Sequence, residues 1–192
     1  MNAHYLAMGL GLLATFGAVM PWQLSQKAEA VELADGTTAF LRPPQFLDAF
    51  TTNDHAMRRN ATYFFTLDLP EDADAPLQSM IIAPQNLTHY LQPYRIDETV
   101  AFASAANGAK NELELGDVVV DDDTQAVTVE FSPPVSPGQQ VTVGLRPQRN
   151  PRLGAIYVFR VTAVPEGDQP QSHIAGHGRL SFTRNDRDRI YP

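Results

Sequence analysis

The sequence predicts an all-β protein, an antiparallel β-sandwich of the immunoglobulin-like type with one or two short helices. After residue 31, apolar residues alternate with polar ones at a period of two, which is typical of half-buried strands. The apolar runs are short, and turn-forming Pro, Gly, Asp and Asn separate them. About seven to nine strands separated by turns are typical of a sandwich, and a closed barrel is the alternative fold.

The first predicted elements are a hairpin and a strongly alternating strand. Residues 31–41 place Asp35 and Gly36, a favoured turn pair, between two short extended pieces. Residues 62–69 form the clearest strand, and Pro70 ends it. Its two predicted faces are Tyr63, Phe65, Leu67 and Leu69 on one side, and Thr62, Phe64, Thr66 and Asp68 on the other.

Further strands follow the same alternation. They are predicted at residues 77–83, 113–120, 126–131, 140–145, 156–163 and 178–183. An acidic turn joins the strands at 113–120 and 126–131 into a hairpin. Residues 85–92 and 98–106 are predicted as short helices, the second ended by Asn107 and Gly108.

The segment "FSPPVSPGQQVTVGL" predicts how two strands are connected. A strand ends before its double proline, and Pro137-Gly138 precedes the next strand, a pattern that favours a crossover between sheets. Tyr157 is expected to act as a corner tyrosine, with its ring in the core and its hydroxyl bonded to a nearby loop.

The chain divides into three predicted parts. Residues 1–30 contain an uncharged apolar run, Pro21 and the sequence "AEA", which predict a secretory signal peptide cleaved after Ala30. Retention of this segment as an anchor is the alternative. Residues 31–183 form one domain, and residues 184–192 form a polar C-terminal tail.

Composition excludes several classes of function. The net charge of −8 gives no global attraction to nucleic acid or to an anionic membrane. The chain has no cysteine, so it has no thiolate site for zinc or an iron–sulfur cluster. Neither a G-x-S-x-G elbow nor an H-E-x-x-H motif is present. We therefore expect no enzyme activity, no cofactor and no membrane span after signal cleavage.

Several segments together carry a resemblance to a known family. They are "VELADGT", "RPPQFLDAFTTN", "ATYFFTLDLPEDADAPLQSMIIAPQN", "GHGRLSF" and, most specifically, "GLRPQRNPRLGAIYVFRVTAVPEG". With them the chain resembles a family of exported cyanobacterial proteins catalogued as domain of unknown function 2808. The resemblance implies a cyanobacterial host and a periplasmic or extracellular location, and it implies no activity, cofactor or catalytic residue.

The predicted ligand site is the arginine-rich and proline-rich segment before residue 156. Arg146, Arg149 and Arg152 recur every three residues, which is one turn of a polyproline helix, and Asn150 lies among them. Guanidinium groups bind carboxylates, sulfates and phosphates, as found on acidic polysaccharides and lipopolysaccharide. In the alternative interpretation these arginines pair with Asp and Glu residues and hold the loop against the sheet.

Two other clusters of polar residues favour a structural interpretation. Asp121, Asp122 and Asp123 lack the spacing of a calcium-binding loop, so we expect a solvated hairpin tip. His173 and His177 are four residues apart, which is about 13 Å along a strand and too far for one metal unless the chain bends at Gly176.

These observations together predict an exported, single-domain module of the cell envelope that binds or supports other components without catalysis. Its expected partner is an envelope polysaccharide or lipopolysaccharide. An alternative is a protein-interaction or assembly module that uses an exposed sheet edge or an apolar face carrying Phe64 and Ile81. A hydrolase of envelope polymers is the third hypothesis, although the sequence does not indicate which two carboxylates would form its catalytic pair.

Overall fold

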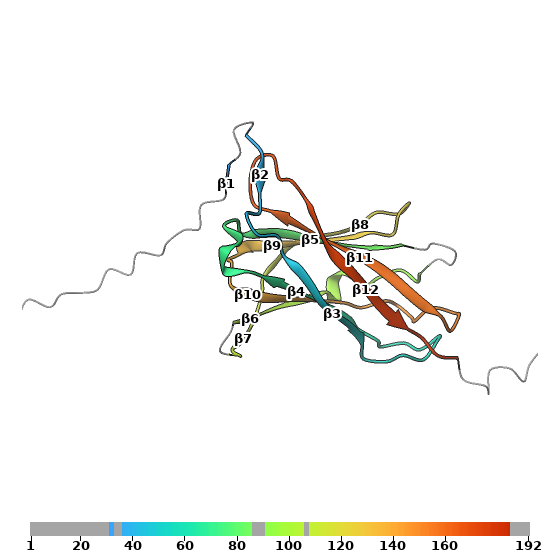
Figure 1. Cartoon of the computed structure of the whole chain (residues 1–192). Coiled ribbons are helices and arrows are strands. Elements are labelled where there is room, and N and C mark those ends of the chain that lie inside the picture. The colour runs from blue at the N-terminus through green and yellow to red at the C-terminus, as the bar shows by residue number, and fades with distance from the viewer. Residues whose placement is uncertain (1–30, 33–35, 86–90, 106–107, 185–192) are drawn as a thin grey trace, which may run out of the picture.

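Two five-stranded antiparallel sheets pack face to face in the computed structural model, which describes residues 31–32, 36–85, 91–105 and 108–184 (Figure 1). The predicted β-sandwich is confirmed. The predicted signal segment, residues 1–30, and most of the predicted tail lie outside the described residues. Within the described part of the chain, no helix has both the length and the apolar character needed to cross a membrane.

The first sheet has the order β3-β4-β10-β6-β7, and the second has the order β12-β11-β5-β9-β8. The first consists of β3 (Gln45–Thr51), β4 (Tyr63–Leu69), β10 (Gln139–Leu145), β6 (Val100–Ala105) and β7 (Lys110–Glu112). The second consists of β12 (His173–Ser181), β11 (Ile156–Pro165), β5 (Leu77–Pro84), β9 (Val127–Val135) and β8 (Leu115–Val120). A separate hairpin pairs β1 (Val31–Glu32) with β2 (Thr38–Ala39), as predicted for residues 31–41.

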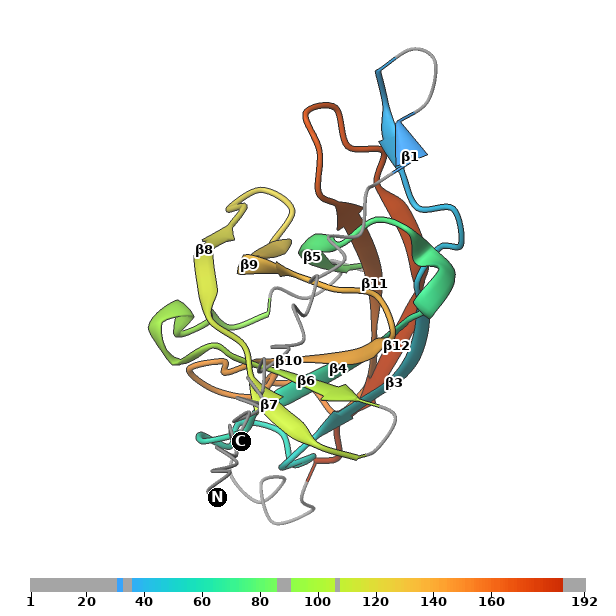
Figure 2. The same cartoon turned by 90° about the vertical axis from the view of Figure 1, so that its left-hand side faces the viewer.

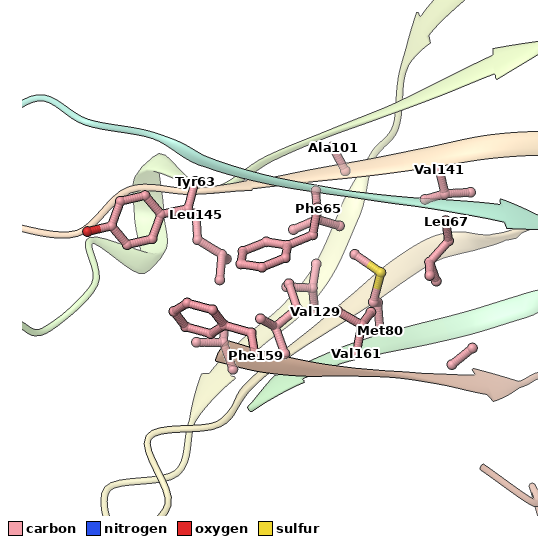
Figure 3. Close-up of a cluster of buried hydrophobic side chains, with 14 of the residues drawn as sticks. Tyr63, Phe65, Leu67, Met80, Ala101, Val129, Val141, Leu145, Phe159 and Val161 are labelled. Carbon is pink, nitrogen blue, oxygen red and sulfur yellow. The ribbon is translucent and has the colours of Figure 1, made fainter. Parts of the chain in front are cut away.

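The core lies between the two sheets and is built from the inward residues of each strand (Figure 3). In β4 every second residue is buried, beginning with Tyr63, as the alternation predicts. Phe65 of β4 meets Phe159 of β11 edge-on, with ring centroids 5.3 Å apart. Such aromatic contacts between facing sheets join the two layers into one hydrophobic unit.

The two open sides of the sandwich are closed in different ways. On one side β12 lies against β3, and a Cβ atom on Gly178 would stand only 2.9 Å from the Cβ of Ala49. On the other side the chain passes directly from β7 in the first sheet to β8 in the second (Figure 2). Glycine at position 178 therefore allows the two sheets to approach closely at one edge.

One predicted helix is wrong. Residues 98–106 contain the strand β6, preceded by the short 3-10 helix η2 (Ile96–Glu98). Ala101 and Ala103 point into the core, and Phe102 points outward, so the segment alternates like a strand although alanine favours helices. Pairing with β10 and β7 overrides the local preference. The other predicted helix, 85–92, falls largely outside the described residues, and a second 3-10 helix, η1, covers Glu71–Ala73.

Strand β9 continues through the double proline, where the sequence predicts a strand end. Its pairing with β8 reaches only Phe131, so Pro133 and Pro134 lie beyond the end of that ladder. Proline has no N–H group to donate, and at this position none is needed by β8. Residues 136–138 then carry the chain from the second sheet to the first, which confirms the predicted crossover.

Candidate functional site

Three segments meet at one end of the sandwich and form the candidate site. They are the loop 52–62 between β3 and β4, the loop 146–155 between β10 and β11, and residues 182–184 after β12, which lie together at the lower right of Figure 1. The N–H of Met57 donates to the carbonyl of Pro151 at 3.0 Å, and the N–H of Thr183 donates to that of Asp54 at 2.8 Å. Backbone hydrogen bonds therefore hold these distant segments in one arrangement.

Asn150 joins the first two loops at their centre. Its side-chain Nδ2 donates to the carbonyls of Asn53 and His55, both at 2.8 Å, and its backbone N–H donates to the carbonyl of Arg58 at 2.7 Å. Its Oδ1 accepts a hydrogen bond of 2.9 Å from the hydroxyl of Tyr63. Burial raises the pKa of Tyr63 well above its ordinary value, so this hydroxyl stays protonated and donates.

The prediction that Asn150 shares an exposed ridge with the arginines is wrong. Its side chain is 0% exposed, and its polar atoms already bond to the chain itself. A buried amide must find hydrogen-bond partners inside the protein, and asparagine at this position supplies both donors and an acceptor. Asn150 is therefore a structural residue of the site.

Arg146 agrees with the alternative interpretation, in which the arginines pair with acidic residues and hold the loop against the sheet. Its Nη1 lies 2.6 Å from Glu98 Oε2, and Glu98 also contacts Arg95 at 3.3 Å. The hydrogen bond from Arg146, helped by the positive charges of both arginines, lowers the pKa of Glu98 below its usual range. A backbone hydrogen bond also joins these two segments, because the N–H of Arg95 donates to the carbonyl of Arg146 at 2.8 Å.

The other two predicted arginines belong to a larger group. Arg149 is half-buried and Arg152 is exposed, and neither forms an ion pair within the described part of the chain. Arg58 and Arg59 on the loop 52–62 and Arg184 after β12 are also exposed and without an ion pair to a described residue. We call these five residues the arginine surface. It concentrates positive charge at one end of a chain whose net charge is −8.

Sequence reasoning found only two members of the arginine surface. Arg58 and Arg59 lie about 90 positions before Arg149 and Arg152, and no spacing rule connects them. A signal was nevertheless present. Two adjacent arginines stand in a polar segment directly before the strongest strand, and any loop at that end of β4 must lie near the loop that follows its neighbour β10.

A second exposed area covers the outer face of the first sheet. Phe50 and Phe64 stack there with ring centroids 5.0 Å apart, next to Gly144. A hollow of about 400 Å³ lies on the same sheet, and its lining includes Asp68, Ser104, Lys110 and Gln140. The predicted apolar face carrying both Phe64 and Ile81 is wrong, because Ile81 lies on β5 in the opposite sheet.

The remaining predicted clusters occupy turns and strands. Asp121 lies in the turn between β8 and β9, where its Oδ1 accepts hydrogen bonds from the N–H groups of Thr124 and Asp123 at 2.7 and 3.0 Å. The bond from Thr124 is the main cause of the lowered pKa of Asp121. His173 and His177 lie on β12, opposite Ala163 and Arg160 of β11. Among the described residues, no three His, Asp or Glu side chains are grouped as a metal site would require.

The fold and this end surface define the chain as an antiparallel β-sandwich domain with an arginine-rich loop end. The family model for the "Protein of unknown function (DUF2808)" matches residues 37–182. The chain belongs to this family, which confirms the resemblance seen in the sequence. The match includes both arginine-bearing loops, whereas Arg184 lies just beyond it.

Several solved structures are similar to the chain at low identity. The collagen-binding domain of a Staphylococcus aureus adhesin has a TM-score of 0.37 and 7% identity, with 71% of this chain and 97% of that chain covered. A DUF4466 family protein from Parabacteroides merdae has a TM-score of 0.43 and 10% identity over 72% and 44% of the two chains. The family 3a carbohydrate-binding module from the cipA scaffolding of Clostridium thermocellum has a TM-score of 0.39 and 12% identity over 70% and 97%.

Likenesses of this size carry no argument about what the chain binds. No curated protein matches the sequence. The functional argument therefore depends on the residues of the site itself.

Proposed function

We propose that this chain is a non-catalytic binding module of the cell envelope, exported to the periplasm or the cell surface, and that its arginine surface holds anionic groups of envelope polymers. One observation carries the proposal. In a chain with a net charge of −8, five arginines without ion pairs to described residues gather on three loops that are hydrogen-bonded to one another. Like charges at one end of the fold repel one another, and an anionic ligand would reduce that repulsion.

The chemistry of guanidinium groups indicates the kind of ligand. Each group presents a planar fork of donors that matches a carboxylate, sulfate or phosphate. Exposed ion pairs are individually weak, so several arginines must act together on a polymer that repeats the anionic group. Uronic-acid polysaccharides and the phosphorylated sugars of lipopolysaccharide have this repeating character.

The loops are also prepared for binding. Asn150 and the backbone bonds at Met57 and Thr183 fix the segments that carry the arginines. A loop that is already ordered loses less entropy when it binds a ligand. Binding then requires only that the arginine side chains adopt the rotamers that contact the anionic groups of the polymer.

Titration with an acidic polysaccharide tests the proposal. We expect Arg149→Gln combined with Arg152→Gln to weaken binding by about fivefold or more at low salt. The matched control is Arg160→Gln with Arg179→Gln, which removes the same charge from exposed positions on β11 and β12. High salt is expected to weaken wild-type binding, since it screens exposed charges. Equal losses in both double variants, or no loss in either, would contradict the proposal.

The assembly hypothesis has its own support in the stacked Phe50 and Phe64 on the outer face of the first sheet. Exposed aromatic side chains on a sheet face are typical of surfaces that contact other proteins. Light scattering measures this directly. A stable dimer that becomes a monomer on Phe50→Ser would favour assembly through this face.

A further inference from the structure

Three exposed apolar side chains lie among the arginines at the loop end. Met57 is 40% exposed, Leu153 is 38% exposed and Ile156 is 65% exposed. They are brought together by the same contacts that join the loops. Met57 bonds to Pro151 through its backbone, and Ile156 pairs with Ser181 at the end of β12. The end of the sandwich is therefore basic and apolar at once.

The three apolar side chains are only partly buried by the fold. Met57 has a φ of 62°, a left-handed conformation that is costly for a residue with a long side chain. Leu153, at 38% exposed, is not part of the hydrophobic core cluster, and Tyr157, four residues later, supplies the buried ring of this segment. Ile156, at 65% exposed, buries the least of the three, and the exposed parts of all three side chains add nothing to the stability of the fold, because only buried apolar area does so.

We infer that the arginine surface docks on an anionic lipid surface, with Met57, Leu153 and Ile156 entering the boundary between headgroups and acyl chains. This inference rests on the proposed function and names the partner of the same site. Basic side chains beside exposed apolar ones are the combination that binds membrane interfaces, because the arginines meet lipid phosphates while the apolar groups leave water. Arginine also keeps its charge at the headgroup level while its stem contacts apolar material.

The chain has a net charge of −8, but two of its described acidic clusters lie away from the arginine surface. Glu71 and Asp72 follow the far end of β4, about 20 Å away by the rise of a strand. The acidic turn at 121–123 follows β8, which is three strands across the sheet from β11, the strand after Arg149 and Arg152, and so about 14 Å away. Both separations exceed the screening length of about 8 Å at physiological salt.

Among the described residues, two acidic side chains near the arginines have partners. Glu98 is paired with Arg146 and Arg95, and Asp54 lies 2.9 Å from the ring nitrogen of His55. The five arginines, which form no ion pair with a described residue, therefore contribute positive potential where a membrane would approach.

Vesicle sedimentation gives the first test. The full chain is mixed with vesicles of phosphatidylglycerol and phosphatidylcholine, or of phosphatidylcholine alone. We expect Met57→Ser, Leu153→Ser and Ile156→Ser together to weaken binding to the anionic vesicles by about tenfold and to leave binding to acidic polysaccharide unchanged. The matched control replaces Leu41, Leu47 and Ile174, which are exposed elsewhere, by serine.

A fluorescent label gives the second test. Its signal comes from one position at the loop end, so it does not depend on any contact that residues 1–30 make with the vesicles. The chain has no cysteine, so Leu153→Cys creates one site for an environment-sensitive dye. We expect a blue shift of its emission on anionic vesicles and none on neutral ones. The same dye on Ser136→Cys, in the turn between β9 and β10 at the other end of the sandwich, should not shift.

The outcomes separate the inference from the proposed function. An unshifted dye at position 153, together with arginine-dependent binding to polysaccharide, would overturn the lipid inference and leave the polymer site standing. Vesicle binding that survives the triple serine substitution would also overturn it. If Arg149→Gln combined with Arg152→Gln weakened neither vesicle binding nor polysaccharide binding, both the lipid inference and the proposed function would be refuted.

Discussion

Replacement of Asn150 by alanine is the sharpest test of how the loop end is built. The substitution removes the two hydrogen bonds that Nδ2 donates to Asn53 and His55 and the one that Oδ1 accepts from Tyr63. It leaves the Tyr63 hydroxyl and two carbonyl oxygens without these partners. No bulky side chain is lost from the core, so the effect reports on hydrogen bonding.

The magnitude follows from the burial of the partners. Leaving a buried polar group unpaired costs about 1 to 3 kcal/mol. Tyr63 is buried, whereas Asn53 and His55 are half-buried and their carbonyls can accept water after a small movement. We therefore expect Asn150→Ala to lower the free energy of unfolding by about 3 to 5 kcal/mol, near the upper end for a single substitution.

Urea denaturation measures this loss. At a slope of about 2 kcal/mol per molar urea, the midpoint should fall by about 2 M. Tyr63→Phe should cost about 1 to 2 kcal/mol, because it removes one of the three side-chain bonds. In the Asn150→Ala background its cost should be smaller, since the partner has already gone.

Two results would refute the reasoning. A loss below about 1 kcal/mol for Asn150→Ala would mean that the three bonds contribute little, or that water replaces them. An undiminished cost of Tyr63→Phe in the double variant would mean that the two side chains are not coupled.

Three further predictions concern the core, the closed edge and the ion pairs. Tyr157→Ala should cost about 3 to 5 kcal/mol in a thermal melt, as for other buried aromatic residues, and an unchanged melting temperature would contradict the assigned packing. Gly178→Ala should cost about 1 to 3 kcal/mol because its Cβ would press on Ala49 at 2.9 Å, whereas Gly116→Ala, facing a flexible side chain at 3.4 Å, should be tolerated. Because the pKa of Glu98 is lowered in the folded state, its pairs stabilise the fold above the ordinary Glu pKa of about 4.3 and are lost as the pH falls further. Acid unfolding between about pH 5 and pH 3 should therefore reduce the stability of the wild type more than that of Glu98→Gln, and parallel curves would contradict this.

Strand positions were predictable wherever the alternation of apolar residues was strong. The strand at Tyr63 and the one at Tyr157 bury every second residue, as their sequences indicate. The strand β3 escaped prediction, because its exposed Leu47 and Phe50 and its irregular pairing between Phe46 and Asp48 break the period of two. The strand at Val100 was predicted as a helix because its inward positions are small alanines, whose apolar signal is too weak to show the period of two.

By itself, the sequence determined the fold class, the family, the turns at Asp121 and at Pro137-Gly138, and the loop that holds Arg149 and Arg152. These depend on local chemistry, namely side-chain periodicity and turn preference. Only the tertiary structure decided that Asn150 is buried, that Arg146 is paired, and that Arg58, Arg59 and Arg184 complete the basic end. The physical reason is that antiparallel pairing brings distant loops to one end of a sheet, and the contacts made there set which polar groups are satisfied and which face solvent.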